Sequence, residues 1–225
     1  MLRLAPFISN HLYPTSDGRP MAETDYHREL MTQLIAELKA RYAADSDTYV
    51  SGNLLIFYRP SDKRRHVSPD CFVVFGVPKG DRLNYLTWEE GKGPDVVIEL
   101  TSKTTRREDE QTKLALYRDV LKVKEYFLFD PFEDYLSPSM QGFRLRAGEF
   151  QPIRFKAGRL PSRLLGVHLE RSGHTLRLWE PTTGQWLPTP DEVIETERQR
   201  GDDLAAEVER LRKLIAHRKN GTNGA

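Results

Sequence analysis

The chain has 225 residues, which is enough for one domain of ordinary size and an appendage. It carries 34 Lys and Arg against 33 Asp and Glu, and this net charge of +1 excludes a uniformly basic nucleic-acid coat but not a local basic groove. The single cysteine, Cys71, excludes a disulfide framework and a cysteine-based zinc site. No apolar run approaches the roughly 20 residues of a membrane span, and the first residues lack the apolar core of a signal peptide. We therefore expect a soluble cytoplasmic protein with no membrane partner.

The N-terminal part is predicted to be an irregular arm followed by a helix. Residues 1–22 contain scattered Pro, Gly and Asn without a clear period. Thr24 can cap the helix that follows, because its hydroxyl can accept a hydrogen bond from a free backbone N–H. Apolar side chains then recur every four residues, which indicates an amphipathic helix of about four turns. These are Tyr26, Leu30, Leu34, Leu38 and Tyr42.

The middle of the chain reads as strands with one helix. Nearly continuous apolar runs are typical of strands that are buried on both faces. They occupy residues 70–77, 95–100 and 125–130, and a less regular strand is expected over 49–58. A helix over 105–121, with Thr105 and Glu108 as a capping box, connects the last two runs into one βαβ unit. This order predicts an α/β fold, in which a mixed central sheet is flanked by the two helices.

The C-terminal part is predicted to contain two hairpins and a charged helix. Residues 142–153 and 175–187 read as hairpins at the periphery, so the domain extends over 23–188. Residues 189–225 form a charged helix that ends in a frayed tail. Its apolar residues have the spacing 4, 3, 4, so it is either a solvated helix or a coiled coil, and a homodimer is a hypothesis. They are Leu204, Val208, Leu211 and Ile215.

Acidic residues on otherwise apolar strands are the candidate chemical groups. Asp70 begins one buried run, and Glu99 lies late in another. A buried carboxylate is unfavourable unless it is paired or binds a metal, and two carboxylates at strand ends can hold Mg²⁺ through oxygen ligands. The alternative is that each carboxylate caps a strand end or pairs with a Lys or Arg. Asp95 shares a strand face with Glu99, but its place after Gly93-Pro94 favours a role at the start of the strand.

A lysine on the following helix completes this set. Lys113 shares a helix face with Tyr117, Val120 and Leu121, and this face is expected to pack on the sheet. An ammonium group at that position can pair with a carboxylate or reach the solvent. Lys103 is the competing lysine, because it is closer to Glu99 in the sequence.

These residues resemble the pattern of a known group of enzymes. The chain is similar to the PD-(D/E)XK nuclease superfamily, and more narrowly to the Uma-two family, whose members are described as putative restriction endonucleases. The resemblance covers about residues 22–180. It is carried by the segments LIFYRPSDKRRHVSPDCFVVFGV, GPDVVIELTSKTTRREDEQTKLALYRDVLKVKEYFLFDP and QGFRLRAGEF.

The resemblance implies a role for individual residues. The two acids of the pattern, which hold the metal, fall on Asp70 and Glu99. The strand lysine of the superfamily would fall on Thr101, whereas the helix lysine of the Uma-two family falls on Lys113. Further positions that the resemblance brings into consideration are Ser102, Lys103 where the family commonly has Pro, and His27 and Glu29 on the first helix.

The implied function is hydrolysis of DNA phosphodiester bonds with Mg²⁺ or Mn²⁺ as the cofactor. Asp70 and Glu99 would hold the metal, and Lys113 would assist the attacking water. Basic residues near the site can contact backbone phosphates, although a solvated charged loop is the alternative. They are Lys63, Arg64, Arg65, Lys103, Arg106 and Arg107. A second hypothesis is an inactive nuclease-fold module that binds nucleic acid or assembles through its C-terminal helix.

Overall fold

The structure is a computed structural model, and it describes residues 13–16, 24–101 and 112–221, with the side chains of the last helix described up to residue 214. The chain divides into two compact units, Met1–Leu187 and Pro188–Ala225. Within the described ranges, none of the helices combines the length and the apolar character needed to cross a membrane.

A six-stranded mixed sheet forms the centre of the first unit. Its strand order is β1-β4-β6-β7-β8-β9, and β6 and β7 run parallel while the other neighbours run antiparallel. The bounds are β1 Thr48–Ser51, β4 Cys71–Phe75, β6 Val96–Leu100, β7 Glu125–Phe129, β8 Met140–Arg146 and β9 Glu149–Pro152. The predicted α/β fold with a mixed central sheet is confirmed, because the three apolar runs are the adjacent strands β4, β6 and β7.

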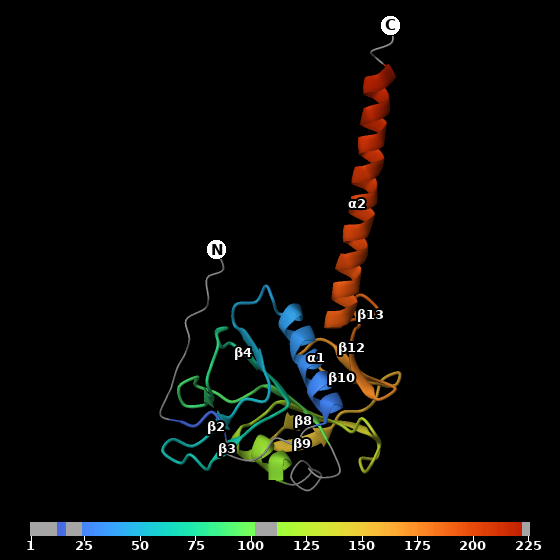
Figure 1. Cartoon of the computed structure of the whole chain (residues 1–225). Coiled ribbons are helices and arrows are strands. Elements are labelled where there is room, and N and C mark those ends of the chain that lie inside the picture. The colour runs from blue at the N-terminus through green and yellow to red at the C-terminus, as the bar shows by residue number, and fades with distance from the viewer. Residues whose placement is uncertain (1–12, 17–23, 102–111, 222–225) are drawn as a thin grey trace. The chain divides into compact units, whose positions relative to one another are not determined.

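Helix α1 (Asp25–Arg41) and a second sheet cover one face of the central sheet. The Thr24 hydroxyl accepts a hydrogen bond from the His27 N–H, so the predicted cap is confirmed. The apolar face of α1, which includes Leu34 and Leu38, belongs to one core cluster with residues of both sheets. Figure 1 shows α1 between β4 and the second sheet. That sheet has the order β10-β11-β12-β13, with β10 Arg159–Pro161, β11 His168–Ser172, β12 Thr175–Glu180 and β13 Gln185–Trp186.

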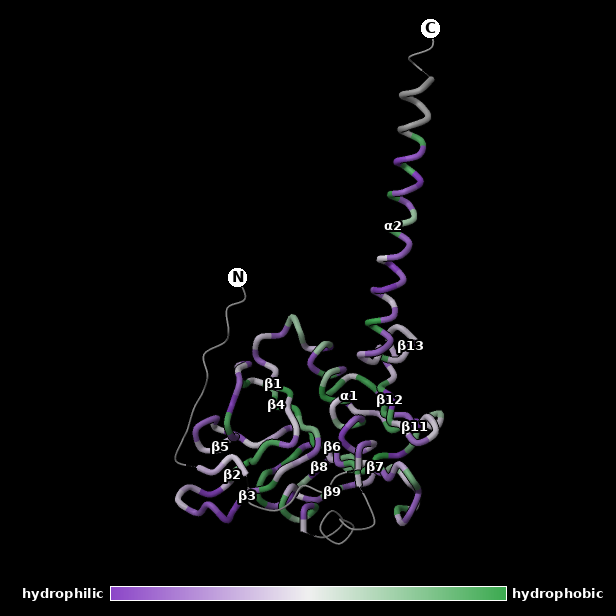
Figure 2. The backbone as a smooth tube through the Cα atoms, viewed as in Figure 1, coloured by the Kyte–Doolittle hydropathy of each residue, from purple (hydrophilic) through white to green (hydrophobic). Residues whose placement is uncertain are grey.

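A different cluster covers the opposite face of the central sheet. It joins alternate residues of β4, β6 and β7 to a small sheet and to the chain before β7. The small sheet has the order β3-β2-β5, with β2 Ile56–Phe57, β3 His66–Val67 and β5 Tyr85–Leu86. Figure 2 shows hydrophobic residues concentrated along the strands of the core. Both faces of β4, β6 and β7 are therefore buried, which explains their nearly continuous apolar sequences.

The chain that follows β6 differs from the regular helix that the sequence predicts. Its first half, including Thr105 and Glu108, lies outside the described residues. The second half contains the π-helix η2 (Leu116–Val120), in which the Leu121 N–H bonds to the Leu116 carbonyl at 3.0 Å. This wider winding turns Val120 away from the sheet, and its side chain is 52% exposed. The prediction that Val120 shares the buried face of Lys113 and Tyr117 is therefore wrong.

The predicted strand over residues 49–58 is two strands in different sheets. The chain leaves β1 at Gly52 and turns at Asn53, whose φ is 48°, before β2 begins. Gly52 lies so close to the neighbouring strand that an added Cβ would stand 1.9 Å from the Asp70 carbonyl oxygen and 2.6 Å from Ile35 Cδ1. Periodicity in the sequence could not reveal this break, because the contact depends on the start of β4.

Both predicted hairpins are present, and they belong to different sheets. The first joins β8 to β9 through Ala147 and Gly148, with φ values of 49° and 85°. Residues 140–144 of β8 pair with β7, so this hairpin belongs to the central sheet. Its two strands are the last two at one edge of that sheet, so the predicted peripheral position is confirmed. The second hairpin joins β12 to β13 in the four-stranded second sheet, with Gly184 at a φ of 70°.

The second unit contains one long helix. Helix α2 spans Pro190–Gly221, and the Thr189 hydroxyl accepts the Glu192 N–H while the Glu192 side chain accepts the Thr189 N–H. These reciprocal bonds form a capping box, which explains why the helix begins here.

We expect Gly52→Ala to destabilise the first unit by about 1–3 kcal/mol, because the new methyl group overlaps the start of β4. Thermal unfolding followed by circular dichroism measures this change. Gly201→Ala on α2 is the matched control, because an added Cβ there meets no atom within 4 Å. A melting temperature of Gly52→Ala equal to that of the wild type would contradict the close approach.

Candidate active site

The antiparallel pairing of β4 and β6 brings two carboxylates together. Cys71 lies opposite Ile98, so one further step along the ladder places Asp70 beside Glu99. The Asp70 N–H donates to Glu99 Oε2 at 3.3 Å. The Glu99 side chain is 1% exposed, whereas that of Asp70 is 15% exposed. The pair thus lies at the end of two core strands, with one carboxylate deep and the other nearer to solvent.

The buried Glu99 carboxylate is held by two side chains from the segment before β7. Its Oε1 lies 3.1 Å from Lys113 Nζ and accepts the Tyr117 hydroxyl at 2.6 Å. A residue and the one four positions later lie on the same side of a helix, so a single element supplies both groups. Because a buried charge is strongly unfavourable without partners, these contacts are what allow a glutamate in the core of the sheet.

The Asp70 carboxylate has partners from two other elements. His27 Nε2, in the first turn of α1, lies 3.1 Å from Oδ1. The Leu100 N–H donates to Oδ2 at 2.7 Å. Asp70 therefore connects the N-terminal end of α1 to the carboxyl end of β6, and its oxygens are directed toward the Glu99 side of the sheet edge.

The donor set of this pair suits a hard divalent cation. A carboxylate accepts about four hydrogen bonds or metal contacts, and within the described residues the Asp70 carboxylate contacts His27 Nε2 and the Leu100 N–H. The residues described by the structure include no group of three His, Cys, Asp or Glu placed to hold a metal. Mg²⁺, however, is commonly bound by one or two carboxylates and keeps several waters, so two carboxylates fit it.

The surroundings keep two neighbouring groups protonated. Burial, followed by the negative charge of Glu99, raises the pKa of Tyr117 well above its ordinary value. Burial also raises the pKa of the Cys71 thiol, with further contributions from Asp70, Glu99 and Glu37. Tyr117 is thus a hydrogen-bond donor at neutral pH, and Cys71 is a buried neutral thiol rather than a nucleophile.

Three residues singled out in the sequence converge here, and others do not. Asp70, Glu99 and Lys113 meet directly, and His27 joins them. Glu29 is exposed. Several positions lie outside the described residues, namely Ser102, Lys103, Arg106 and Arg107. Sequence reasoning treated Tyr117 as an apolar packing residue, although its spacing of four from Lys113 already indicated a shared face.

Asp95 lies at the opposite end of β6 and has a different role. Its carboxylate bonds to Lys92 Nζ at 2.6 Å, to Lys124 Nζ at 2.7 Å and to the Phe75 N–H at 2.8 Å. Burial raises the pKa of Asp95, but the bonds from Lys124, Lys92 and Phe75 outweigh it and lower the pKa. Asp95 lies four residue steps before Glu99, or about 13 Å along the strand, so its ion pairs hold the start of β6 and not the carboxylate pair.

Thr101 occupies the position at which the superfamily pattern has a strand lysine. Its N–H donates to the Phe129 carbonyl at 2.7 Å, and the residue is 2% exposed. The cation at Glu99 comes instead from Lys113, on the element that follows the strand. This arrangement is the one that the helix-lysine pattern implies.

The basic loop of Lys63, Arg64 and Arg65 is solvated. Arg64 and Arg65 lie 3.3 Å and 3.7 Å from the Asp62 carboxylate, and their side chains are 91% and 56% exposed. Such exposed ion pairs contribute little to stability.

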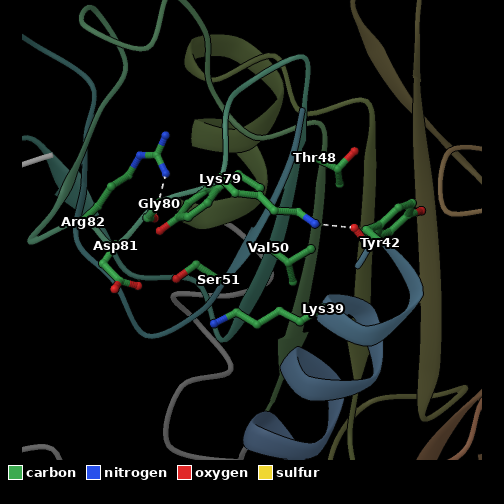
Figure 3. A pocket seen from close by; sticks show the side chains of 10 residues that line it. Lys39, Tyr42, Thr48, Val50, Ser51, Lys79, Gly80, Asp81 and Arg82 are labelled. Carbon is green, nitrogen blue, oxygen red and sulfur yellow. Dashed lines mark hydrogen bonds between the residues drawn. The ribbon is translucent and has the colours of Figure 1, made fainter. Parts of the chain in front are cut away.

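A cavity of about 380 Å³ lies along the outer edge of β1. It is lined by Lys39, Tyr42, Thr48, Tyr49, Val50, Ser51, Lys79, Gly80, Asp81 and Arg82. Figure 3 shows the amino group of Lys39 on the Ser51 side and that of Lys79 turned to the Tyr42 carbonyl. Arg82 binds Glu90, whereas Lys39 is exposed and has no ion pair within the described residues.

The cavity is lined by the edge strand β1, whose outer side pairs with no other strand among the described residues. β1 is an edge strand, and the Gly76 N–H donates to the Asp47 carbonyl at 2.7 Å. Ladder bonds involve alternate residues, so the N–H and C=O groups of Thr48 and Val50 point to the open edge. Ser51, at the far end of β1, precedes Gly52, which touches the Asp70 backbone.

Comparisons with known proteins identify similar sequences and folds. The family model Uma2, described as "Putative restriction endonuclease", matches residues 9–178. A crystal structure of "a putative nuclease belonging to DUF820" from Anabaena variabilis ATCC 29413 is similar at a TM-score of 0.46 and 17% identity, covering 69% of this chain and 85% of that chain. No curated protein matches the chain.

We expect Tyr117→Phe to lower the free energy of unfolding by about 2 kcal/mol at pH 7, because Glu99 loses a buried donor. The raised pKa of Tyr117 contributes stability that is complete below pH 10 and is lost as the pH rises through the folded-state value. Denaturant unfolding at pH 7 and pH 10.5 measures both effects. The difference in the free energy of unfolding between the wild type and Tyr117→Phe should be smaller at pH 10.5. A constant difference would contradict this role of the hydroxyl.

Proposed function

The chain belongs to the Uma2 family, and we propose that it is a metal-dependent endonuclease that hydrolyses DNA phosphodiester bonds. The observation that carries this proposal is the carboxylate pair of Asp70 and Glu99, with Lys113 Nζ 3.1 Å from the deeper carboxylate. An ion pair alone would also bury Glu99, but it would not need a second carboxylate at the same strand end. Two acids and one cation at the end of adjacent strands are the groups that metal-dependent phosphodiester hydrolysis uses.

The proposed roles follow from burial and contact. Asp70 and Glu99 would hold Mg²⁺ or Mn²⁺, which when bound lowers the pKa of a coordinated water and binds a phosphate oxygen. Lys113 places a positive charge beside the reacting phosphate and orients the attacking water. Tyr117 keeps the Glu99 carboxylate in position, and His27 does the same for Asp70.

In this proposal the nucleic-acid backbone follows the cavity beside β1. Lys39 and the Ser51 hydroxyl line it, and the open-edge N–H groups of β1 are further donors for phosphate oxygens. Because β1 leads to Gly52 and the start of β4, a strand that follows this edge would pass from the cavity to Asp70. Contacts of this kind provide affinity and position without reading the base sequence.

The second hypothesis is a nuclease-fold module that binds nucleic acid or assembles through its C-terminal helix without cleavage. The exposed apolar residues of α2 favour an assembly role for that helix. Both hypotheses predict binding, but only the first predicts that cleavage depends on the carboxylate pair.

The decisive measurement is cleavage of supercoiled, linear and single-stranded DNA with Mg²⁺, with Mn²⁺ and with EDTA. We expect metal-dependent cleavage by the wild type and a loss of at least about 100-fold in Asp70→Asn and Glu99→Gln, because each removes a ligand charge. Lys113→Gln should lose cleavage but keep metal binding, since the amide can still donate to Glu99. Lys103→Ala tests the competing lysine.

Calorimetric titration of the same proteins with Mg²⁺ and Mn²⁺ distinguishes the two hypotheses. Metal binding that is lost in Asp70→Asn supports the endonuclease even when the DNA substrates lack a required target site. Glu170→Gln, a change at a carboxylate of the second sheet, is the control and should bind metal like the wild type. Absence of metal binding by the wild type would favour the inactive module.

We expect Lys39→Ala to bind DNA more weakly than the wild type and to show a smaller salt dependence. Loss of one phosphate contact lowers the slope of log K against log [salt] by about 0.9 for duplex DNA. Fluorescence anisotropy at several salt concentrations, without metal, gives this slope. Lys156→Ala, at an exposed lysine that does not line the cavity, is the control. An unchanged slope in Lys39→Ala would contradict the proposed path.

A further inference from the structure

Helix α2 carries a row of apolar side chains that the second unit leaves exposed. Leu204 is 66% exposed, Val208 40% and Leu211 45%. Figure 2 shows short hydrophobic stretches of α2 separated by hydrophilic ones. Their spacing of four and three places them on one side of the helix, and Ile215 continues the spacing in the sequence. We call Leu204, Val208, Leu211 and Ile215 the seam.

We propose that the seam joins α2 to the same helix of a second copy of this chain, in a parallel two-stranded coiled coil. The heptad assignment puts Val208 and Ile215 at position a, and Leu204 and Leu211 at position d. β-branched residues at a together with leucine at d favour two parallel strands over higher oligomers. In such a dimer each seam residue meets its own counterpart, so the surface is complementary to itself.

The charges beside the seam indicate the same partner and orientation. Glu207 occupies a g position, and Arg212 occupies the e position of the next heptad. In a parallel dimer these positions face each other across the interface, so Glu207 of each copy pairs with Arg212 of the other. An antiparallel dimer that aligns the same seam instead places Glu207 opposite Leu214 and Arg212 opposite Ala205. Within its own helix Glu207 is already paired with Arg210, whose Nε lies 2.8 Å from Glu207 Oε2. Of the two dimer arrangements, only the parallel one gives Glu207 and Arg212 an interhelical partner of opposite sign.

The short seam limits the strength of this contact. Gly201 takes the preceding a position and Glu197 the preceding d position, so the apolar core extends over about two heptads. A coiled coil with only about two apolar heptads is marginally stable, so we expect a dimer that dissociates on dilution. A dimer carries two copies of the carboxylate pair, which would allow one copy to act on each strand of a DNA duplex. This statement about DNA rests on the proposed function, whereas the dimer itself does not.

Light scattering after size exclusion measures the mass of the full-length chain at increasing concentration. We expect the mass to approach twice the chain mass of 26.0 kDa at high concentration and to stay near 26.0 kDa in Leu211→Lys. Ala206→Lys adds the same charge at an f position, away from the seam, and should dimerise like the wild type. Lysine is a good helix former, so circular dichroism should show α2 intact in both variants. A wild type that is monomeric at every concentration, or a Leu211→Lys dimer, would overturn the proposal.

Charge exchange and cross-linking test the orientation. Glu207→Arg and Arg212→Glu should each weaken the dimer, and the double variant should restore it, because the pair is re-formed with reversed signs. The native Cys71 is buried and is not available for cross-linking. A disulfide-linked dimer of Leu204→Cys or of Leu211→Cys therefore forms through the introduced cysteine. Both variants should form disulfide-linked dimers on oxidation. Cross-linking at neither or only one position, or a double variant no stronger than the singles, would overturn the parallel arrangement.

Discussion

Burying a carboxylate inside an apolar sheet is unfavourable unless hydrogen-bond donors and a cation reach it, and this constraint organises the first unit. Glu99 is 1% exposed and lies in a strand whose other residues form the two cores. Its partners within the described residues include the Lys113 ammonium, the Tyr117 hydroxyl and the Asp70 N–H. Asp70 is placed by the pairing of β4 with β6, and Lys113 and Tyr117 are placed by the packing of their segment on the sheet. The site therefore depends on the fold, and the buried Glu99 depends on the site.

The winding of the chain before β7 shows how this demand affects local structure. A wide turn with i→i+5 bonding ends at Leu121, while Lys113 and Tyr117 remain on the side of the sheet. Such π segments are uncommon in helices and occur frequently at functional sites. Here the departure from regular winding leaves Val120 in solvent, and the polar ends of two long side chains meet the carboxylate.

The two units use apolar residues in different ways. In the first unit, two clusters fill the space on both faces of the central sheet, and α1 connects the central sheet to the second sheet. Among the described residues of the second unit, α2 is the one regular element, and its leucines and valines up to residue 214 are exposed. Exposed apolar side chains in a row are typical of an interaction surface, and the partner that we propose for the seam is a second copy of the chain.

The sequence by itself determined the buried strands β4, β6 and β7, the cap and apolar face of α1, and the identity of Asp70, Glu99 and Lys113 as unusual groups. Apolar runs and apolar residues at every fourth position are local signals. The family resemblance identified Asp70 and Glu99 as the two acids of a known pattern. Only the tertiary structure decided that β1 ends at Gly52, that β8 joins the central sheet, and that Tyr117 and His27 complete the carboxylate pair. These features depend on contacts between residues that are distant in the chain, and no local pattern encodes which strand edge or carboxylate a side chain will meet.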